Sequence, residues 1–376
     1  MSRALRIVVL APLRYPISVP HAGGLESAIW NEVRELRRRG HHVTLAAPEG
    51  SDFLEQSPPE FILPAVAWGD SPHLNDVGHP AGYLEVALPA LHRALDYISR
   101  NSEQFDLIMN HSLQPAPLAR AAELGVPVVS TLHTPVLRDL VSANIELERG
   151  GSRFIAVSEH TAGEWRRAGI PSVVLSNGIE PDDWPLGQGG DGLVWFGRIV
   201  PEKAPHLAIE AAQRLGRPLA IVGRVGDRAY AEREVFSRLG PDVSYLGPLG
   251  VPELAAVVGR SACTLVTPVW HEPFGLVIPE SLSCGTPVAA FDAGGIGETA
   301  ARTSGVATVP IGDAAALADA AELAIAEVAS GAVTRAEIRA SAVAAFSYAH
   351  RTGRLESLLR DILSETAITG AGEQVA

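Results

Sequence analysis

Cysteine is scarce in this sequence, with only two residues, Cys263 and Cys284, among 376. Both lie in apolar stretches, which is typical of small core residues in a reducing compartment. Long hydrophobic runs are also missing, because no apolar stretch reaches the ~18 residues that a membrane-spanning helix requires. The N-terminus has no signal-like pattern. We therefore expect a cytoplasmic protein without a membrane span.

Positive charge is in deficit as well. The chain carries 30 Lys and Arg against 43 Asp and Glu, which gives a formal net charge of −13 at pH 7. An acidic surface disfavours binding to nucleic acid and to anionic membranes. We therefore expect no nucleic-acid partner and no stable membrane association, while the oligomeric state stays open.

Several well-known active-site motifs are absent. There is no Gly-x-x-x-x-Gly-Lys-Ser/Thr loop, which argues against an ATPase of that class. No Gly-x-Gly-x-x-Gly follows the first expected strand, which argues against a nicotinamide or flavin enzyme. Asp182-Asp183 is not an Asp-x-Asp pair, no His/Cys cluster has zinc spacing, and no nucleophile elbow is present. We therefore expect neither a cofactor nor a metal.

The sequence does contain a regular alternation of short apolar runs and amphipathic segments. Its length exceeds the ~250–300 residues at which one core stops growing, so two domains are expected. Runs rich in β-branched residues predict parallel strands buried on both faces. The expected strands are 6–10, 42–47, 61–63, 106–110, 127–133, 154–158 and 173–176, followed by 192–197, 219–222, 243–246, 264–267, 287–291 and 306–309. Such a pattern predicts two doubly wound α/β sheets.

Apolar residues at helical spacing predict the helices. They are expected around 29–36 and at 83–98, 204–215, 228–239, 252–260, 280–284, 313–329 and 347–364. Pro89 should kink its helix or divide it in two. The first domain is expected to span residues 1–169 and the second 170–345. Residues 366–376 have little to bury, and we expect them to be disordered.

Residues 271–280 carry two acids, Glu272 and Glu280, eight positions apart. A Pro-Phe-Gly turn follows the first acid, and Pro279 before the second suits the first turn of a helix. A loop and helix start of this kind present backbone N–H groups that hold phosphate. The two carboxylates would then accept hydrogen bonds from sugar hydroxyls beside a diphosphate.

Arg198 and Lys203 lie on one loop between an expected strand and an expected helix. They can converge on one phosphate group at the carboxyl edge of the second sheet. The alternative is that both are merely solvated cations. Because residues 271–280 belong to the same edge, the combination predicts a nucleotide-sugar site.

Weaker signals lie in the first domain. Gly23-Gly24 follows the first strand, where such folds bring backbone against phosphate, although a simple turn is an equally good interpretation. His111 and His133 each fall at the carboxyl end of a strand, where ligands bind in open α/β sheets. A lone histidine is more often structural, but two at one edge favour a function for at least one.

Together these residues resemble the family 4 retaining glycosyltransferases of GT-B architecture, also described as glycosyl transferases group 1. The pieces that carry the resemblance, in chain order, are Gly23-Gly24, Arg39-Gly40-His41-His42-Val43, Thr131-Leu132-His133-Thr134, Val157-Ser158, Ser176-Asn177-Gly178-Ile179, Gly197-Arg198 with Glu202-Lys203, and Glu272 with Glu280. The family implies two Rossmann-like domains facing a cleft, with a C-terminal helix at 346–365 crossing back onto the first. Where Lys203-Ala204 stands, the family often has Lys-Gly.

The resemblance also implies roles for single residues. Arg198 and Lys203 would bind the donor diphosphate and stabilise leaving-group charge, Glu272 would hold donor-sugar hydroxyls, and His133 would face the reacting carbon. Donor binding would involve Glu280 at the ribose, Leu249 and Val225 at the base, and the backbone of Gly23, Gly24, Phe274, Gly275 and Leu276. Asn110 and His111 are candidates on the acceptor side.

The implied function is transfer of a hexose, with retention, from a nucleoside diphosphate sugar to a hydroxyl group. A UDP-linked donor is favoured, and front-face transfer needs no protein nucleophile and no metal. Residues 51–98 contain few basic residues, which favours a small soluble acceptor. The alternatives are a UDP-sugar epimerase of the same architecture, or a non-catalytic nucleotide-sugar-binding protein.

Overall fold

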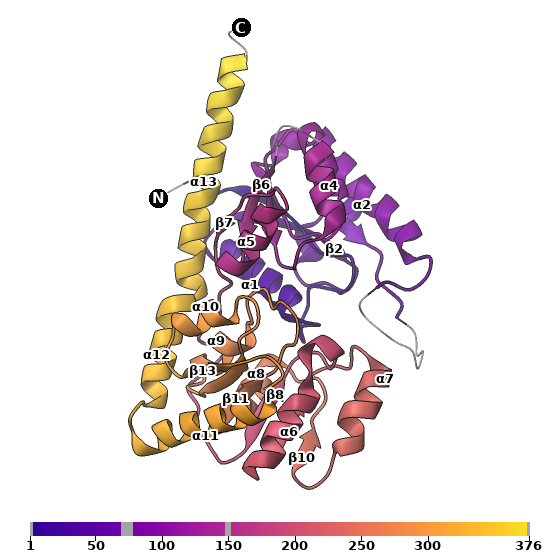
Figure 1. The fold of residues 1–376 in the computed structure, drawn as a ribbon. Helices are drawn as coiled ribbons and strands as arrows, with labels where there is room; N and C mark the ends of the chain where they lie inside the picture. The colour runs from indigo at the N-terminus through magenta and orange to yellow at the C-terminus, as the bar shows by residue number, and fades with distance from the viewer. Residues whose placement is uncertain (1–2, 69–77, 147–151, 374–376) are drawn as a thin grey trace.

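The computed structural model describes residues 3–68, 78–146 and 152–373 (Figure 1). Two parallel sheets form the framework, as predicted. The first has the strand order β3-β2-β1-β4-β5-β6-β7, and the second has the order β10-β9-β8-β11-β12-β13. We call the first sheet and its helices the N-terminal domain, and the second sheet and its helices the C-terminal domain.

Most strands begin and end within one or two residues of their predicted positions, because each is a short buried apolar run. The strands of the first sheet are β1 (Arg6–Leu10), β2 (His42–Pro48), β3 (Ile62–Leu63), β4 (Leu107–Asn110), β5 (Val128–Leu132), β6 (Ser152–Ala156) and β7 (Val173–Val174). Those of the second are β8 (Leu193–Phe196), β9 (Leu219–Val222), β10 (Val243–Tyr245), β11 (Cys263–Val266), β12 (Val288–Phe291) and β13 (Val306–Val309). Since β7 pairs with β6, the first sheet continues past the boundary predicted near residue 170.

Helices cover both faces of each sheet. The N-terminal domain contains α1 (Gly24–Arg38), α2 (Tyr83–Arg100), α3 (Ala116–Ala119), α4 (Arg138–Glu146) and α5 (Glu159–Arg167). The C-terminal domain contains α6 (Pro205–Leu215), α7 (Arg228–Tyr230), α8 (Val251–Gly259), α9 (Val277–Ser283), α10 (Ile296–Ala301), α11 (Ala314–Ser330) and α12 (Arg335–Phe346). Short 3₁₀ turns lie at Leu54–Gln56, Pro59–Phe61, Ser102–Gln104, Ala121–Glu123 and Pro201–Lys203.

The last helix, α13 (Tyr348–Glu373), leaves the C-terminal domain and runs along the N-terminal domain (Figure 1). Leu355, Leu359 and Ile362 of α13 are buried in the same core cluster as the apolar residues of β1 and α1. The predicted crossing of the C-terminal helix is therefore confirmed. Helix α13 extends to Glu373, into the segment 366–376 for which disorder was predicted. Residues 374–376 lie outside the described ones.

Several predicted helices differ in detail. Pro89 lies inside a single helix, α2, so the division into two helices is wrong. The proline is exposed, which lets solvent hydrate the carbonyl group left without a donor. The segment predicted as one helix at 228–239 is α7 followed by a π-helical turn (Ala231–Val235) and a 3₁₀ turn (Phe236–Arg238). No helix range was predicted for α3, α4, α5, α10 or α12.

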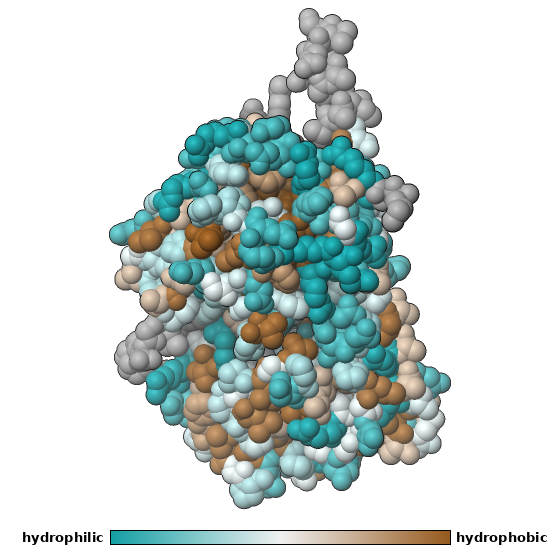
Figure 2. Space-filling view, turned by 180° about the vertical axis from the view of Figure 1, so that it is seen from behind, coloured by the Kyte–Doolittle hydropathy of each residue, from teal (hydrophilic) through white to brown (hydrophobic). Residues whose placement is uncertain are grey.

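Polar and apolar side chains are distributed unevenly over the surface. On the face opposite to that of Figure 1, hydrophilic side chains dominate the upper, N-terminal part, whereas hydrophobic ones are more frequent over the lower part (Figure 2). Among the described residues, no helix combines the length and apolar character needed to cross a bilayer.

Candidate active site

A cleft of about 720 Å³ separates the two domains. Loops at the carboxyl ends of β1 and β5 form one wall, and loops after β8, β9 and β11 form the other. Strand order reverses on either side of β1 and of β8, and open parallel sheets bind ligands at such points. The volume lies within the ~300–1,000 Å³ that is usual for small-molecule sites.

Most of the predicted site residues share this cleft. Those that line it are Gly23, Gly24, His133, Arg198, Lys203, Leu249, Glu272, Phe274, Gly275, Leu276 and Glu280. Three others, Asn110, His111 and Val225, lie outside it. The structure therefore brings the two domains' candidates together across a single cavity.

The loop after β8 carries the two predicted phosphate-binding cations. Thr267 Oγ1 donates to the carbonyl oxygens of Lys203 and Ala204, at 2.8 and 3.0 Å, and fixes the loop. Ala204 has φ +45°, a left-handed conformation that costs a non-glycine residue ~1–2 kcal/mol and explains why glycine suits this position. Arg198 lies on the same loop, with one guanidinium nitrogen 3.5 Å from Glu202. Lys203 is the only lysine in the sequence.

Glu272 lies beside Lys203, in the loop between β11 and α9. Its Oε2 contacts Lys203 Nζ and accepts a hydrogen bond of 2.8 Å from Trp270 Nε1. Its carbonyl oxygen accepts from the Gly295 N–H at 2.7 Å, and a side chain on Gly294 would approach that oxygen to 2.3 Å. Lys203 has three N–H donors, so its contact with Glu272 leaves others for a phosphate oxygen.

Glu280 lies in the first turn of α9, which begins at Val277, two residues before the predicted start at Pro279. Its side chain lines the cleft and is half-buried, and the resulting desolvation raises its pKa to about 8. Hydroxyl groups that donate to the carboxylate would favour the charged form and lower that pKa. The residue is therefore suited to bind a diol such as a ribose.

The two walls approach each other at the glycine pair. A Cβ atom on Gly24 would lie 3.3 Å from Leu276 Cδ1 of the opposite domain. A Cβ atom on Gly23 would lie 3.1 Å from Glu26 Oε2 and 3.8 Å from Arg198 Cδ. A side chain at Gly24 would therefore crowd the opposite wall, whereas one at Gly23 would crowd Glu26 of its own domain.

The turn at 274–276 closes the C-terminal wall of the cleft. Gly275 has φ +82°, which favours glycine, and Phe274 packs edge-on against Phe346 with ring centroids 5.5 Å apart. This packing anchors the turn to the end of α12. Its backbone is held in place next to Glu272, as the predicted phosphate-binding loop requires.

His133, at the end of β5, is supported from behind by a chain of buried polar groups. His111 Nδ1 lies 2.8 Å from His133 Nε2, and His111 Nε2 lies 2.9 Å from Glu32 Oε1. The other oxygen of Glu32 lies 2.6 Å from a guanidinium nitrogen of Arg351, on α13. Glu32, His111 and Arg351 are all at most 5% exposed. His111 therefore supports His133 rather than lining the cleft.

Burial and the neighbouring charges set the pKa values of Glu32 and His133. Burial would raise the pKa of Glu32, but Arg351 and His111 outweigh it and lower the pKa to about 2. Burial, with a smaller contribution from His111, holds the pKa of His133 well below its ordinary value. The hydrogen bond between His111 Nδ1 and His133 Nε2 fixes the His133 ring. His133 Nδ1 takes no part in this contact.

Asn110 and Val225 stabilise the two sheets. Asn110 Nδ2 donates to Ser130 Oγ at 3.0 Å, and its Oδ1 accepts from the Ser112 N–H at 3.1 Å, so the side chain ties β4 to β5. Val225 packs against the core of the second sheet and forms a bridge with Ile199. Neither side chain reaches the cleft.

The residue before Val225 lines the cleft instead. Arg224 lines the cleft, donates to the carbonyl oxygen of Ala22 at 2.7 Å, and lies over the ring of Tyr15 at 4.4 Å. These contacts join the two domains next to the cavity. Leu249 lines the same side, as predicted.

Sequence reasoning missed Glu26, Glu32, Arg224, Trp270 and Arg351. Arg224 follows β9 at the sheet edge that already supplied Arg198, and this position was a usable signal. Glu32 and Arg351 are 319 positions apart in a pairing that only the crossing of α13 creates. No local pattern could have found that pair.

Comparison with known proteins agrees with this geometry. The model of Glycosyltransferase Family 4 matches residues 22–183, and that of Glycosyl transferases group 1 matches residues 190–327. A D-inositol 3-phosphate glycosyltransferase of Gordonia bronchialis is 30% identical over 346 residues, covering 78% of this chain and 74% of the relative. One of Mycolicibacterium paratuberculosis is 27% identical and covers 96% and 91%.

Solved structures show the same fold. HepE of Anabaena, in complex with UDP and glucose, has a TM-score of 0.72 at 20% identity, covering 95% of this chain and 99% of that one. Sucrose-phosphate synthase of Thermosynechococcus elongatus has a TM-score of 0.76 at 18% identity, covering 96% and 100%. Fold, sequence relatives and cleft agree, and the chain belongs to the family 4 glycosyltransferases, as a hexosyltransferase of GT-B architecture.

Proposed function

We propose that this enzyme transfers a hexose from a UDP-linked donor to a hydroxyl group of a small soluble acceptor, with retention of anomeric configuration. The observation that carries the proposal is the convergence of Arg198, Lys203, Glu272 and Glu280 on one wall of a single cleft. A structural neighbour of the same fold was solved with UDP-glucose, which favours uridine as the base.

The donor would lie along the C-terminal wall. Arg198 and Lys203 would neutralise the diphosphate, whose negative charge grows as the bond from the anomeric carbon to the phosphate oxygen breaks. Glu272 would accept from hydroxyls of the sugar, and Glu280 from those of the ribose. Leu249 would pack on the base.

Transfer would proceed on the face that the phosphate leaves. The acceptor oxygen forms its bond to the anomeric carbon as the phosphate oxygen departs, and the acceptor proton passes to that phosphate oxygen. The chain's own groups hold the two partners together and stabilise the leaving charge. His133, fixed through Nε2, would position the sugar with its other ring nitrogen.

The names of two relatives narrow the choice of acceptors to test. Two of them are named for transfer to D-inositol 3-phosphate, a polyol with one phosphate. The N-terminal wall of the cleft includes Arg14, a cation that suits an anionic polyol, and Arg34, whose guanidinium group is paired with Asp183 at 2.8 Å. Inositol phosphate is therefore the first acceptor to test, followed by neutral sugars.

The experiment is a donor and acceptor screen on the purified chain after treatment with a chelator. UDP-glucose, GDP-mannose and UDP-N-acetylglucosamine are each incubated with inositol 3-phosphate, with neutral sugars and without acceptor, and the product's anomeric configuration is read by NMR. We expect acceptor-dependent UDP release and a product with the donor's configuration. An inverted product would overturn the retaining mechanism, and release of an epimer without acceptor would favour the epimerase alternative.

A further inference from the structure

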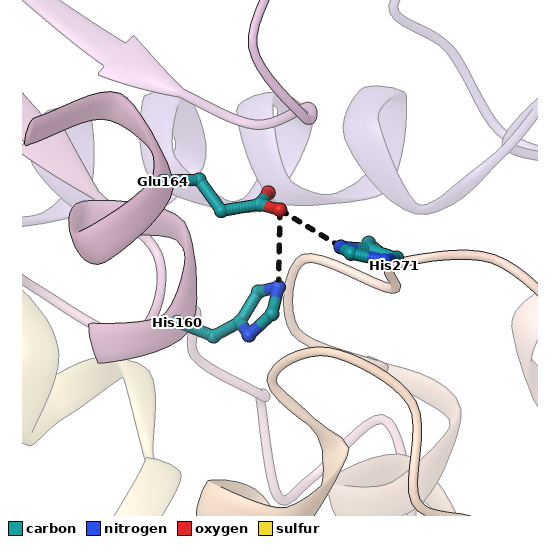
Figure 3. A group of neighbouring side chains, drawn as sticks. All are labelled: His160, Glu164 and His271. Atoms are coloured by element: carbon teal, nitrogen blue, oxygen red, sulfur yellow. Dashed lines mark hydrogen bonds and ion pairs between the residues drawn. The ribbon is translucent and has the colours of Figure 1, made fainter. Parts of the chain in front are cut away.

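A second cluster of polar side chains lies where the two domains meet, outside the residues that line the cleft. His160 and Glu164 occupy successive turns of α5, and His271 comes from the loop between β11 and α9 (Figure 3). The three side chains point toward one another from different domains. None of them has a part in the proposed transfer.

The geometry of the cluster is compact. His271 Nδ1 lies 2.8 Å and His160 Nε2 lies 3.6 Å from the same oxygen of Glu164, and all three atoms fall within 4.8 Å of one another. The two imidazole rings meet edge to face, with centroids 5.4 Å apart. The side chain of His271 is 65% exposed, so an ion can reach the cluster from solvent.

One nitrogen of this cluster lacks a hydrogen-bond partner among the described residues. His160 Nε2 is buried without a hydrogen bond, since 3.6 Å to Glu164 is too long for one. A buried ring nitrogen ordinarily finds a partner. His160 Nε2 points toward the Glu164 oxygen that His271 also contacts. An ion bound between these three atoms would give the nitrogen its missing partner.

Two imidazoles and one carboxylate form a donor set with a definite preference. Imidazole nitrogen suits Zn²⁺ and its first-row neighbours, whereas Mg²⁺ and Ca²⁺ select oxygen ligands. A tetrahedral Zn²⁺ with bonds of ~2.0–2.2 Å needs ligand atoms ~3.3–3.6 Å apart, which small side-chain rotations here would provide. Three protein ligands leave the fourth position to water.

We propose that His160, Glu164 and His271 form a binding site for Zn²⁺ or a similar divalent transition metal, which clamps the two domains together at their junction. Hydrogen bonds already join the two domains at this point. Glu298 of α10 accepts hydrogen bonds from the backbone N–H groups of Glu159 and His160, at 2.7 and 2.5 Å. The C-terminal domain thereby caps the helix that carries two of the ligands.

The site also bears on the donor wall. His271 directly precedes Glu272, so an ion that holds His271 against α5 restrains the segment that carries the proposed sugar ligand. The ion stabilises the arrangement of the domains and takes no part in bond making. The two buried cysteines cannot compete for the metal, because Cys263 and Cys284 lie in the core of the second domain.

The test uses full-length protein without a polyhistidine tag, stripped with a chelator. Equilibrium dialysis against micromolar Zn²⁺ is compared for the wild type, His160→Asn, Glu164→Gln and His271→Asn. The matched control is His92→Asn, which changes an exposed histidine on α2. Circular dichroism of the metal-free proteins establishes that each variant is folded.

We expect one Zn²⁺ per chain in the wild type and in the control. Since loss of even an outer-sphere partner weakens metal binding ~10- to 100-fold, each ligand variant should lose at least that much affinity. Zn²⁺ should also raise the Tm of the wild type and the control in proportion to its concentration, and leave the ligand variants unchanged. Wild-type protein that binds no Zn²⁺, or a His271→Asn variant that binds it equally well, would overturn the proposal.

Discussion

The two walls of the cleft are built in different ways. The C-terminal wall takes its charged groups from three loops and one helix start, and each of these segments is continuous in the sequence. The N-terminal wall presents His133, whose support comes from α1, β4 and the distant α13. One wall is assembled from local segments and the other from long-range contacts. Damage to them should therefore have different consequences, and the predictions below test that difference.

The largest effect is expected from the N-terminal wall. Arg351→Ala leaves Glu32 buried with only His111 as a partner, and removing one member of a buried ion pair costs ~3–5 kcal/mol of stability. Urea unfolding measures the loss. The matched control is Arg354→Ala on the exposed face of the same helix, where a change within ~0.5 kcal/mol is expected. Equal stability of the two variants would show that the buried chain contributes little.

The C-terminal wall should lose mainly rate. Lys203→Ala removes a donor from the leaving phosphate, and losing one such group costs ~10²–10³ in kcat, or ~2.7–4 kcal/mol. UDP release measures the rate, and the loss of Tm should be smaller than for Arg351→Ala, because Glu272 is more exposed than Glu32 and keeps its hydrogen bond from Trp270. An activity near that of the wild type would contradict the role.

The single lysine allows a second test of this wall. Because Lys203 is the only lysine, an amine-selective acetylating reagent can modify only this side chain and the N-terminus. Mass spectrometry should show that UDP-glucose slows acetylation of Lys203 and leaves that of the N-terminus unaffected. Equal rates with and without donor would place the diphosphate elsewhere.

A smaller, pH-dependent effect is expected at Glu280. Its pKa of about 8 means that the carboxylate needed by the ribose must be formed against desolvation below that pH. Affinity for UDP-glucose should therefore rise by up to ~10-fold per pH unit as pH approaches 8, and level off above it. Calorimetry at several pH values measures this, and Glu280→Gln should bind more weakly with no such rise.

Stability should show the opposite sign at Glu280. The folded-state pKa lies above the ordinary value of 4.5, so the unfolded chain loses this proton first. Between these two values the unfolded state binds fewer protons than the native state, and stability falls as pH rises. Relative to Glu280→Gln, the wild type should lose stability from pH ~4.5 to ~8. A constant difference between them would contradict the assignment.

The smallest effect separates two apolar residues of the C-terminal domain. Leu249→Ala should raise the KM for donor several-fold, since it removes ~1–2 kcal/mol of contact with the base. Val225→Ala, whose side chain packs in the core, should lower stability by about 1 kcal/mol and leave the KM unchanged. A raised KM for Val225→Ala with an unchanged KM for Leu249→Ala would instead assign the contact with the base to Val225.

The fold was predictable because its signals are local. Strands such as β1 and β9 are short apolar runs, and both occupy their predicted residues. The predicted helices differ from the observed ones where solvent or neighbouring residues override the local sequence preference. Pro89 is tolerated inside α2 because it faces water, and the residues after Tyr230 change from α-helical to π and 3₁₀ turns.

The site residues that were predicted and those that were missed differ in the same way. Arg198, Lys203, Glu272 and Glu280 follow strands or begin a helix, so sequence position alone brought them to one sheet edge. Glu32 could not be found in this way, because it is an ordinary acid on an amphipathic helix until His111 and Arg351 surround it. Likewise, His271 meets α5 only after both domains have folded and docked.

The crossing of α13 has a consequence for biosynthesis. As the chain leaves the ribosome, the N-terminal sheet is complete long before residues 351–362 are made. Until then the groove between β1 and α1 lacks Leu355 and Leu359, and Glu32 lacks its guanidinium partner. The first domain to be synthesised is therefore the last to be finished, and its nascent form should be a substrate for chaperones.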